Sequence, residues 1–395
     1  MNDNRNYTPA GQPVTQPLYN GQPVYTAPQN PAPVQNPTPV YTYPPQGGNG
    51  APVYAQPVQP VYYEPIQPPK WADPARLEQK ELRRAASRLS FATMTSLPIQ
   101  VLWTTLATLI LMVCGVNLMG PNTIGGFPPT AYYLISSIAS FLSIVLPFSF
   151  FLFFGKRKLS DTVLVEKNGV LNSVLLVFAG LAVSVLMNIL ANRISQLLEG
   201  AGLNGDANTA DLLAMTPVQA LTMFVSVVLV APVTEEFAFR SVTTAVMRRW
   251  GDWPAVIFSA LIFGMAHYSI QSLPVVLMAG FVMALLYVRT RNIWVSIFVH
   301  MLNNLLATLP IALEGLVGAD AANIASNLLT YIVYGLGLIA LVVLLIRNFT
   351  GHKVFRTPMQ RGVPVRGKAL WMFVNPGFIC YFVLFVVMCI VTLYS

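Results

Sequence analysis

The chain has 395 residues, of which 54% are hydrophobic and only 10% are charged. A soluble domain carries about 25% charged residues, so this composition excludes an ordinary soluble protein and indicates several membrane-spanning helices. The formal net charge is +8, but the basic residues lie at the ends of apolar segments and form no single patch, which argues against nucleic acid as a partner. The three cysteines, Cys114, Cys380 and Cys389, lie inside apolar segments, so neither a disulfide framework nor a zinc-binding cysteine spacing is predicted.

Residues 1–69 form an N-terminal segment rich in Pro, Gln, Asn, Tyr and Gly, in which Pro-Val-Tyr recurs. Such a composition cannot bury a hydrophobic core, so we expect a disordered tail. Its function stays open between a spacer and a binding segment for a partner that recognises Pro or Tyr. No secretory signal is predicted, because no apolar segment lies near the start.

Residues 70–95 follow with a different pattern, in which apolar residues such as Leu82 and Leu89 alternate with basic residues such as Arg83, Arg84 and Arg88. This pattern is typical of a basic amphipathic helix that lies at the membrane surface. We expect it to anchor the first membrane span on the cytoplasmic side.

Residues 96–395 are predicted to form an all-α polytopic bundle of about eight or nine transmembrane helices. The apolar segments of the sequence predict spans at 97–118, 130–154, 170–195, 216–247, 254–272, 273–288, 292–310, 325–346 and 369–393. Nine spans with a cytoplasmic N-terminus place every Lys- and Arg-rich loop on the cytoplasmic face. The sequence therefore predicts a multi-pass protein of the cell membrane, with the lipid bilayer as its surroundings.

Ionisable residues inside such spans are costly and mark functional sites by default. The fourth predicted span contains two adjacent carboxylates, Glu235 and Glu236, and Arg240 follows the second after one helical turn. Glu236 and Arg240 are therefore expected to pair on one face of the helix. Glu235 points about 100° away from that face and has no partner on its own helix, which makes it a candidate general base.

Two further segments carry polar residues at membrane depth. His267 follows Phe263 by one turn in the fifth predicted span, and His300 shares a helix face with Asn304 in the seventh. Measured inward from the expected cytoplasmic ends, Glu235 and His267 lie at about 20 Å, Asn304 at about 18 Å and His300 at about 12 Å. Because three helices place their polar groups in one layer of the bilayer, we expect a common site.

These groups can activate water for attack on a carbonyl in two ways. A carboxylate can take a proton from the water while His and Asn donors hold the developing oxyanion. Alternatively Glu235, His267 and His300 could bind a divalent metal such as zinc, which would activate the water. The spacing H-E-x-x-H is absent, and no Ser or Cys nucleophile is evidently associated with the histidines. The sequence leaves the metal-bound and the metal-free mechanism open.

The three patterns Glu-Glu-x-x-x-Arg, Phe-x-x-x-His and His-x-x-x-Asn, in this order on separate membrane helices, resemble the motifs of the CAAX prenyl endopeptidase and bacteriocin-processing family of intramembrane proteases, also called the Abi family. The resemblance covers the core at about 216–310 and implies hydrolysis of a peptide bond in a membrane-associated peptide or protein. CAAX-type processing and bacteriocin-related maturation or immunity are the substrate classes that it suggests.

The resemblance also implies roles for the candidate residues. Glu235 would be the catalytic base, Glu236 and Arg240 would complete the first motif, and His267 would contact the water. His300 and Asn304 would bind a metal or stabilise the oxyanion. Two other functions remain as alternatives: a transporter that uses the intramembrane Glu and His residues as a relay, and a non-catalytic membrane scaffold that recruits partners through its tail.

Overall fold

The computed structural model describes residues 18–19, 22–23, 74–116, 118, 123–124, 126–203, 215–352, 354–356 and 367–394. The chain divides into two units, Met1–Pro65 and Ile66–Ser395. In the first unit, strands β1 (Leu18–Tyr19) and β2 (Gln22–Pro23) pair antiparallel. The rest of the predicted disordered tail lies outside the described residues.

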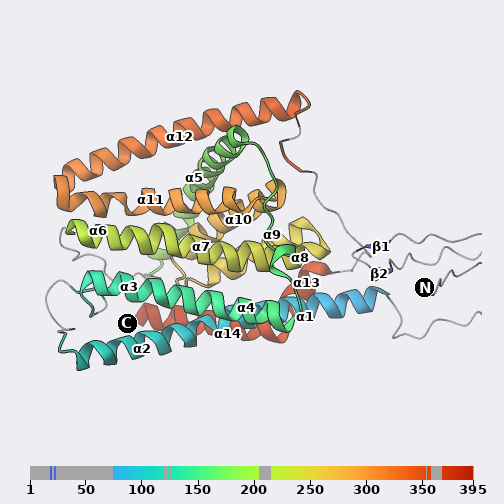
Figure 1. The fold of residues 1–395 in the computed structure, drawn as a ribbon, viewed down its shortest axis with the longest axis horizontal. Helices are drawn as coiled ribbons and strands as arrows, with labels where there is room; N and C mark the ends of the chain where they lie inside the picture. Colours follow the sequence, from blue (N-terminus) through green and yellow to red (C-terminus); the bar gives the residue numbers. More distant parts are fainter. Residues whose placement is uncertain are drawn as a thin grey trace, which may run out of the picture. The chain divides into compact units, whose positions relative to one another are not determined.

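The second unit is a bundle of helices (Figure 1). The α-helices are α1 (Pro74–Met94), α2 (Ser96–Val113), α3 (Pro129–Ser140), α4 (Leu146–Phe154), α5 (Val170–Gly200), α6 (Pro217–Met223), α7 (Ala231–Glu236), α8 (Ala245–Met247), α9 (Asp252–Met265), α10 (Leu273–Thr290), α11 (Ile293–Val317), α12 (Ala319–Phe349), α13 (Lys368–Phe373) and α14 (Pro376–Tyr394). Wider π-helical turns are η2 (Phe141–Val145), η4 (Phe224–Val230) and η5 (Phe237–Thr244), and short 3₁₀ turns are η3 (Leu159–Asp161) and η6 (Arg248–Trp250).

Eight helical segments among the described residues are long and apolar enough to cross a membrane. They are Ala75–Val113, Pro129–Phe154, Val170–Gly200, Pro217–Trp250, Leu273–Thr290, Ile293–Val317, Ala319–Phe349 and Pro376–Leu393. The prediction of an all-α polytopic membrane bundle is thus confirmed.

The fifth predicted span, 254–272, differs from the structure. Helix α9 has 14 residues and ends at Met265, so it rises about 21 Å, less than the roughly 30 Å of a bilayer core. The apolar sequence continues beyond the helix end, and hydropathy therefore overestimates its length. Consequently His267 lies in the turn between α9 and α10, not inside a helix.

Prolines explain two of the π-helical turns and the break between α1 and α2. A proline has no N–H, so it cannot bond to the carbonyl four residues earlier. Pro98 follows the break at Thr95, Pro147 follows η2, and Pro232 follows η4. In η4 the Ala231 N–H instead bonds to the Ser226 carbonyl, five residues earlier.

Helix α1 packs along α14 and also contacts α13 and α4 (Figure 1). Its apolar face, which includes Leu82, Ala86 and Leu89, is fully buried against these helices. The sequence placed this face on the membrane surface, but an amphipathic pattern looks the same whether its apolar side meets lipid or protein. The first helix is therefore part of the protein core.

The contact between α1 and α14 requires a glycine at position 377. A Cβ atom added to Gly377 would lie 2.1 Å from the Ser87 carbonyl oxygen, and the Ser87 hydroxyl accepts the Gly377 N–H at 3.0 Å. Gly377→Ala must force the two backbones apart, and overpacking of this kind costs about 1–3 kcal/mol. We expect a lower free energy of unfolding, measured by thermal or denaturant unfolding in detergent.

Gly335→Ala in α12 is the matched control, because no atom lies within 4 Å of the Cβ that it would add. Alanine also has the higher helix propensity, so this variant should be as stable as the wild type or slightly more stable. Equal stability of the Gly377→Ala and Gly335→Ala proteins would contradict the predicted close approach.

Candidate active site

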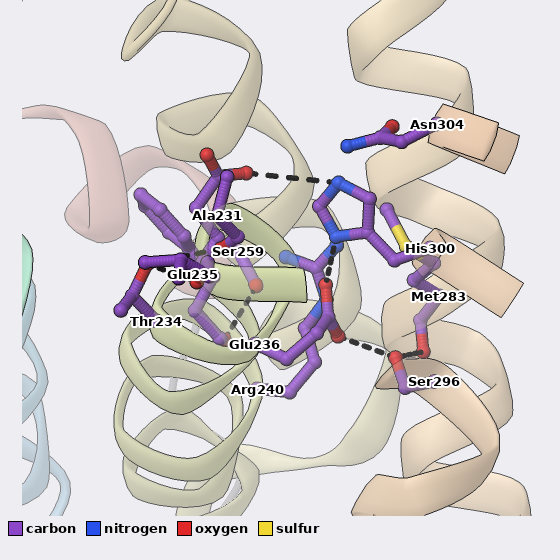
Figure 2. A network of polar contacts seen from close by, with 12 residues as sticks. Ala231, Thr234, Glu235, Glu236, Arg240, Ser259, Met283, Ser296, His300 and Asn304 are labelled. Carbon is purple, nitrogen blue, oxygen red and sulfur yellow. Dashed lines mark hydrogen bonds and ion pairs between the residues drawn. The ribbon is translucent and has the colours of Figure 1, made fainter. Parts of the chain in front are cut away.

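The buried ion pair predicted from the first motif is present. The Arg240 Nε atom lies 3.0 Å from Glu236 Oε2, and both side chains are completely buried (Figure 2). Glu236 ends α7 and Arg240 lies in η5, one turn further along the same continuous helix. Because each buried charge lies beside its opposite, the ion pair holds both side chains in place on the helix that carries the site.

Glu236 also connects this helix to α11. Its Oε1 atom lies 3.0 Å from His300 Nδ1, and its Oε2 atom accepts the Ser296 hydroxyl (Figure 2). An ionised carboxylate can only accept hydrogen bonds, so the hydrogen of this contact is carried by Nδ1. Glu236 thereby sets the orientation of the imidazole and leaves Nε2 facing the other carboxylate.

Glu235 lies on the other side of the same imidazole. Its Oε2 atom is 3.7 Å from His300 Nε2, and its side chain is 17% exposed (Figure 2). Glu235 also lines a hollow of about 160 Å³, which His267 lines as well. A separation above 3.5 Å between two polar atoms is suited to a shared water molecule. The carboxylate predicted as a base is therefore adjacent to both an imidazole and an accessible space.

His267 is an exposed side chain in the turn after α9. Its Nδ1 atom lies 3.1 Å from the Phe263 carbonyl oxygen, and the next residue, Tyr268, has a φ of 51°. A non-glycine residue with positive φ is uncommon and often stands at a functional turn. The prediction that His267 lies near Glu235 is thus supported by the shared hollow, although the residue leaves the helix that was expected to carry it.

Phe263 contacts both histidines and the arginine. Its ring centroid lies 5.1 Å from that of His267 and 5.9 Å from that of His300, both edge-on, and Arg240 Cζ lies 4.6 Å from the centroid. The aromatic face attracts the guanidinium, and its edges pack against the imidazoles. The second motif therefore supplies an aromatic ring that packs against Arg240 and against both histidines.

Asn304 lies one turn after His300 on α11 (Figure 2). Its Nδ2 atom donates to the Val227 carbonyl at 2.9 Å, inside η4. A π-helical turn displaces backbone carbonyls from the regular pattern, and the asparagine amide binds one of them. One of the two Nδ2 hydrogens is used in this way, and the second remains as a donor beside His300.

Sequence reasoning missed Ser296. This buried serine donates to Glu236 and contacts the Met283 carbonyl at 3.2 Å. It precedes His300 by four residues and so shares the helix face of His300 and Asn304. A search of the same helix face one turn before His300 would have identified Ser296 from the sequence.

Ser296→Ala should lower the stability of the protein. The variant leaves a buried carboxylate oxygen without one of its donors, which costs about 1–3 kcal/mol. The free energy of unfolding in detergent measures the loss. Ser149→Ala is the control, because Ser149 is exposed on α4. If Ser296→Ala lowers the free energy of unfolding no more than Ser149→Ala does, the role given to Ser296 is contradicted.

The metal ligands named from the sequence are Glu235, His267 and His300. A zinc ion needs three or four protein ligands at about 2 Å. In the part of the chain that the structure describes, no three His, Cys, Asp or Glu side chains are grouped to hold one ion. His300 Nδ1 is engaged by Glu236, so its Nε2 atom alone would be available. A metal held by Glu235, His267 and His300 stays a prediction.

The fold and site together define a polytopic helical membrane protein with a buried carboxylate–imidazole cluster. Residues 217–306 match the family described as type II CAAX prenyl endopeptidase, Rce1-like. This segment contains all three motifs, so the family resemblance predicted from them is confirmed there. The chain is also 31% identical over 140 residues to "Putative membrane peptidase YdiL" of Bacillus subtilis (strain 168). No solved structure matches the chain.

The match to the Bacillus protein has limited extent. It covers 35% of this chain and 57% of the relative. The tail, α1 and the last helices fall outside residues 217–306. What they contribute must therefore be inferred from the structure itself.

Proposed function

We propose that this protein is an intramembrane endopeptidase that hydrolyses a peptide bond in a membrane-associated peptide or protein. One observation carries the proposal: Glu235 lies 3.7 Å from His300 Nε2 beside a hollow that His267 also lines. The match of residues 217–306 to a prenyl endopeptidase family supports the reaction class. CAAX-type processing and bacteriocin-related maturation or immunity are the substrate classes that we propose.

In the proposed reaction, Glu235 takes a proton from a water molecule held beside His300 Nε2. The water oxygen attacks the carbonyl carbon, and the C=O electron pair moves onto the oxygen. His300 and Asn304 lie on one face of α11. With a proton on Nε2 as well as on Nδ1, His300 would stabilise this oxyanion together with the Asn304 amide, while His267 would contact the water from the turn after α9. Collapse of the intermediate breaks the C–N bond, and Glu235 returns the proton to the leaving nitrogen.

Glu236 and Arg240 act in this scheme by positioning. Their ion pair is buried, so neither group is directed at the hollow. Glu236 instead holds His300 through Nδ1, and Ser296 holds Glu236. Such outer contacts fix the rotamers of the groups that touch the reacting atoms.

The metal-dependent version of this reaction is tested separately. Glu235 and His300 Nε2 could serve as two ligands, and a bound divalent cation would polarise the carbonyl or activate the water. We propose the metal-free route, because among the described residues no third His, Cys, Asp or Glu side chain joins Glu235 and His300 in a group that could hold a metal ion. Elemental analysis of the purified protein, with peptide cleavage after chelator treatment, should show no stoichiometric metal and an unchanged rate. Loss of activity restored by zinc alone would favour the metal route.

The proposed activity is tested with the purified protein in detergent or liposomes and an internally quenched peptide pool. We expect cleavage products whose new carboxylate incorporates oxygen from labelled water, detected by mass spectrometry. Ion or solute flux across liposomes without any peptide cleavage would support a transporter instead.

We also propose that the N-terminus lies in the cytoplasm. When α9 is counted as the fifth of nine crossings, the basic loops of the sequence alternate with loops that lack Lys and Arg, which is the pattern of the positive-inside rule. Reporter fusions at the N-terminus and in the loop at 155–169 should both report the cytoplasmic side.

A further inference from the structure

The hollow beside Glu235 is lined about equally by polar and apolar atoms, and most of its polar side chains come from outside the matched segment 217–306. We call it the polar hollow and define it by Glu235, His267 and five further polar residues: Thr93, Ser96, Gln100, Ser140 and Ser143. These five come from α1, α2, α3 and η2. Polar side chains gathered inside an apolar bundle carry a desolvation cost, which indicates that they serve a ligand.

The hydroxyl groups of the polar hollow are arranged as acceptors. Thr93 donates its hydrogen to the Leu89 carbonyl at 3.0 Å, and Ser96 donates to the Thr93 carbonyl at 2.6 Å. A hydroxyl group whose hydrogen is already donated still has oxygen lone pairs that can accept a hydrogen bond. The polar hollow therefore offers hydroxyl oxygens to a ligand that carries N–H groups.

The Gln100 carboxamide, exposed at the start of α2, has both donor and acceptor atoms. Together with the hydroxyl oxygens, the carboxamide supplies both acceptors and a donor for the N–H and C=O groups of an extended peptide.

Two larger pockets have the opposite character. One of about 360 Å³ lies among α5, α10 and α12, and one of about 640 Å³ lies along α5 and α11. Their linings are mostly apolar and include neither Glu235, His267 nor His300. Hydrocarbon groups are better accommodated in these pockets, and the polar hollow is suited to a peptide.

We propose that the polar hollow binds the substrate backbone beside the scissile bond and accepts Gly, Ala or Ser there. Its volume of about 160 Å³ is close to that of a cavity that holds one benzene-sized group, which leaves no room for a stretch of backbone together with bulky side chains. This inference rests on the proposed endopeptidase function. It assigns substrate selection to α1, α2, α3 and η2.

The test is a protection experiment on the full chain. Cys114, Cys380 and Cys389 are replaced by Ala, Glu235 by Gln to prevent turnover, and Ser140 by Cys. A charged methanethiosulfonate reagent labels the new thiol in the presence of matched peptides with central Gly-Ala or central Phe-Leu, or of N-acetyl-farnesylcysteine. At a peptide concentration near four times its dissociation constant, the Gly-Ala peptide should slow labelling about fivefold. The other two probes should leave the rate unchanged.

Two further variants serve as a second reporter and a control. Gln100→Cys reports the same hollow from an exposed position that tolerates substitution. Phe150→Cys lies on α4 at 56% exposure and does not line the hollow. No probe should protect Phe150→Cys.

The outcomes separate this inference from the proposed function. Protection by farnesylcysteine but not by peptides, or equal protection by both peptides, would overturn the inference. If the wild type cleaves peptides while neither reporter thiol is protected, the function stands and the role of the polar hollow is refuted. If protection occurs but no peptide is cleaved, the hollow binds peptides and the proposed function fails.

Discussion

Glu235→Gln should lower the rate of peptide cleavage by about 10²–10⁴-fold, the contribution typical of a general base. The carboxamide is nearly the same size as the carboxylate but cannot accept a proton from water. Glu235 is partly exposed beside the polar hollow and is not part of the buried ion pair, so the variant should fold and insert normally. The turnover rate of purified protein on quenched peptides measures the effect.

Glu199→Gln is the matched control for this result, since Glu199 is exposed at the end of α5, outside the site. It should cleave at the wild-type rate. A Glu235→Gln protein that cleaves as fast as the Glu199→Gln protein would show that another group activates the water.

Arg240→Met should cause the largest loss of stability among single substitutions in the site. It removes the guanidinium 3.0 Å from Glu236 and leaves that carboxylate buried with only Ser296 and His300 as partners. Removing one partner of a buried ion pair costs about 3–5 kcal/mol. Unfolding in detergent should show this loss, and cleavage should fall as well because Glu236 no longer holds His300 firmly.

A second substitution tests the reason for the loss. In the Arg240→Met/Glu236→Gln protein no unpaired charge is buried, so part of the stability should return, although not the activity. Arg193→Met, at an exposed position of α5, is the single-site control. If Arg240→Met is no less stable than Arg193→Met, the ion pair contributes nothing to the fold.

The contacts within a helix could be predicted from the sequence because helical geometry fixes them. Residues four apart lie on one face, so the pairing of Glu236 with Arg240 and the shared face of His300 and Asn304 followed from spacing alone. The packing of Phe263 against His267 also followed, even though the helix ends between them. Because the chain makes only a tight turn after Met265, Phe263 and His267 stay in contact as they would within a helix.

Contacts between helices were not accessible in the same way. Ser296 and Glu236 are 60 residues apart, and no periodic pattern indicates that they meet. The contribution of α1 and α2 to the polar hollow could not be predicted from the sequence either, because Ser and Thr residues occur in many apolar helices. The burial of α1 was missed because hydrophobic periodicity does not distinguish a lipid surface from a neighbouring helix.

The close approach of Ser87 and Gly377 has a consequence for biogenesis. These residues are 290 positions apart, so the apolar face of α1 is not fully covered until α14 has been synthesised. α14 also supports the turn that carries His267, because Tyr381 donates to the Ile262 carbonyl at 3.1 Å. A nascent chain should therefore lack the proposed peptidase activity until its C-terminal helix has been inserted by the translocation machinery. The order of synthesis would then delay the proposed proteolysis.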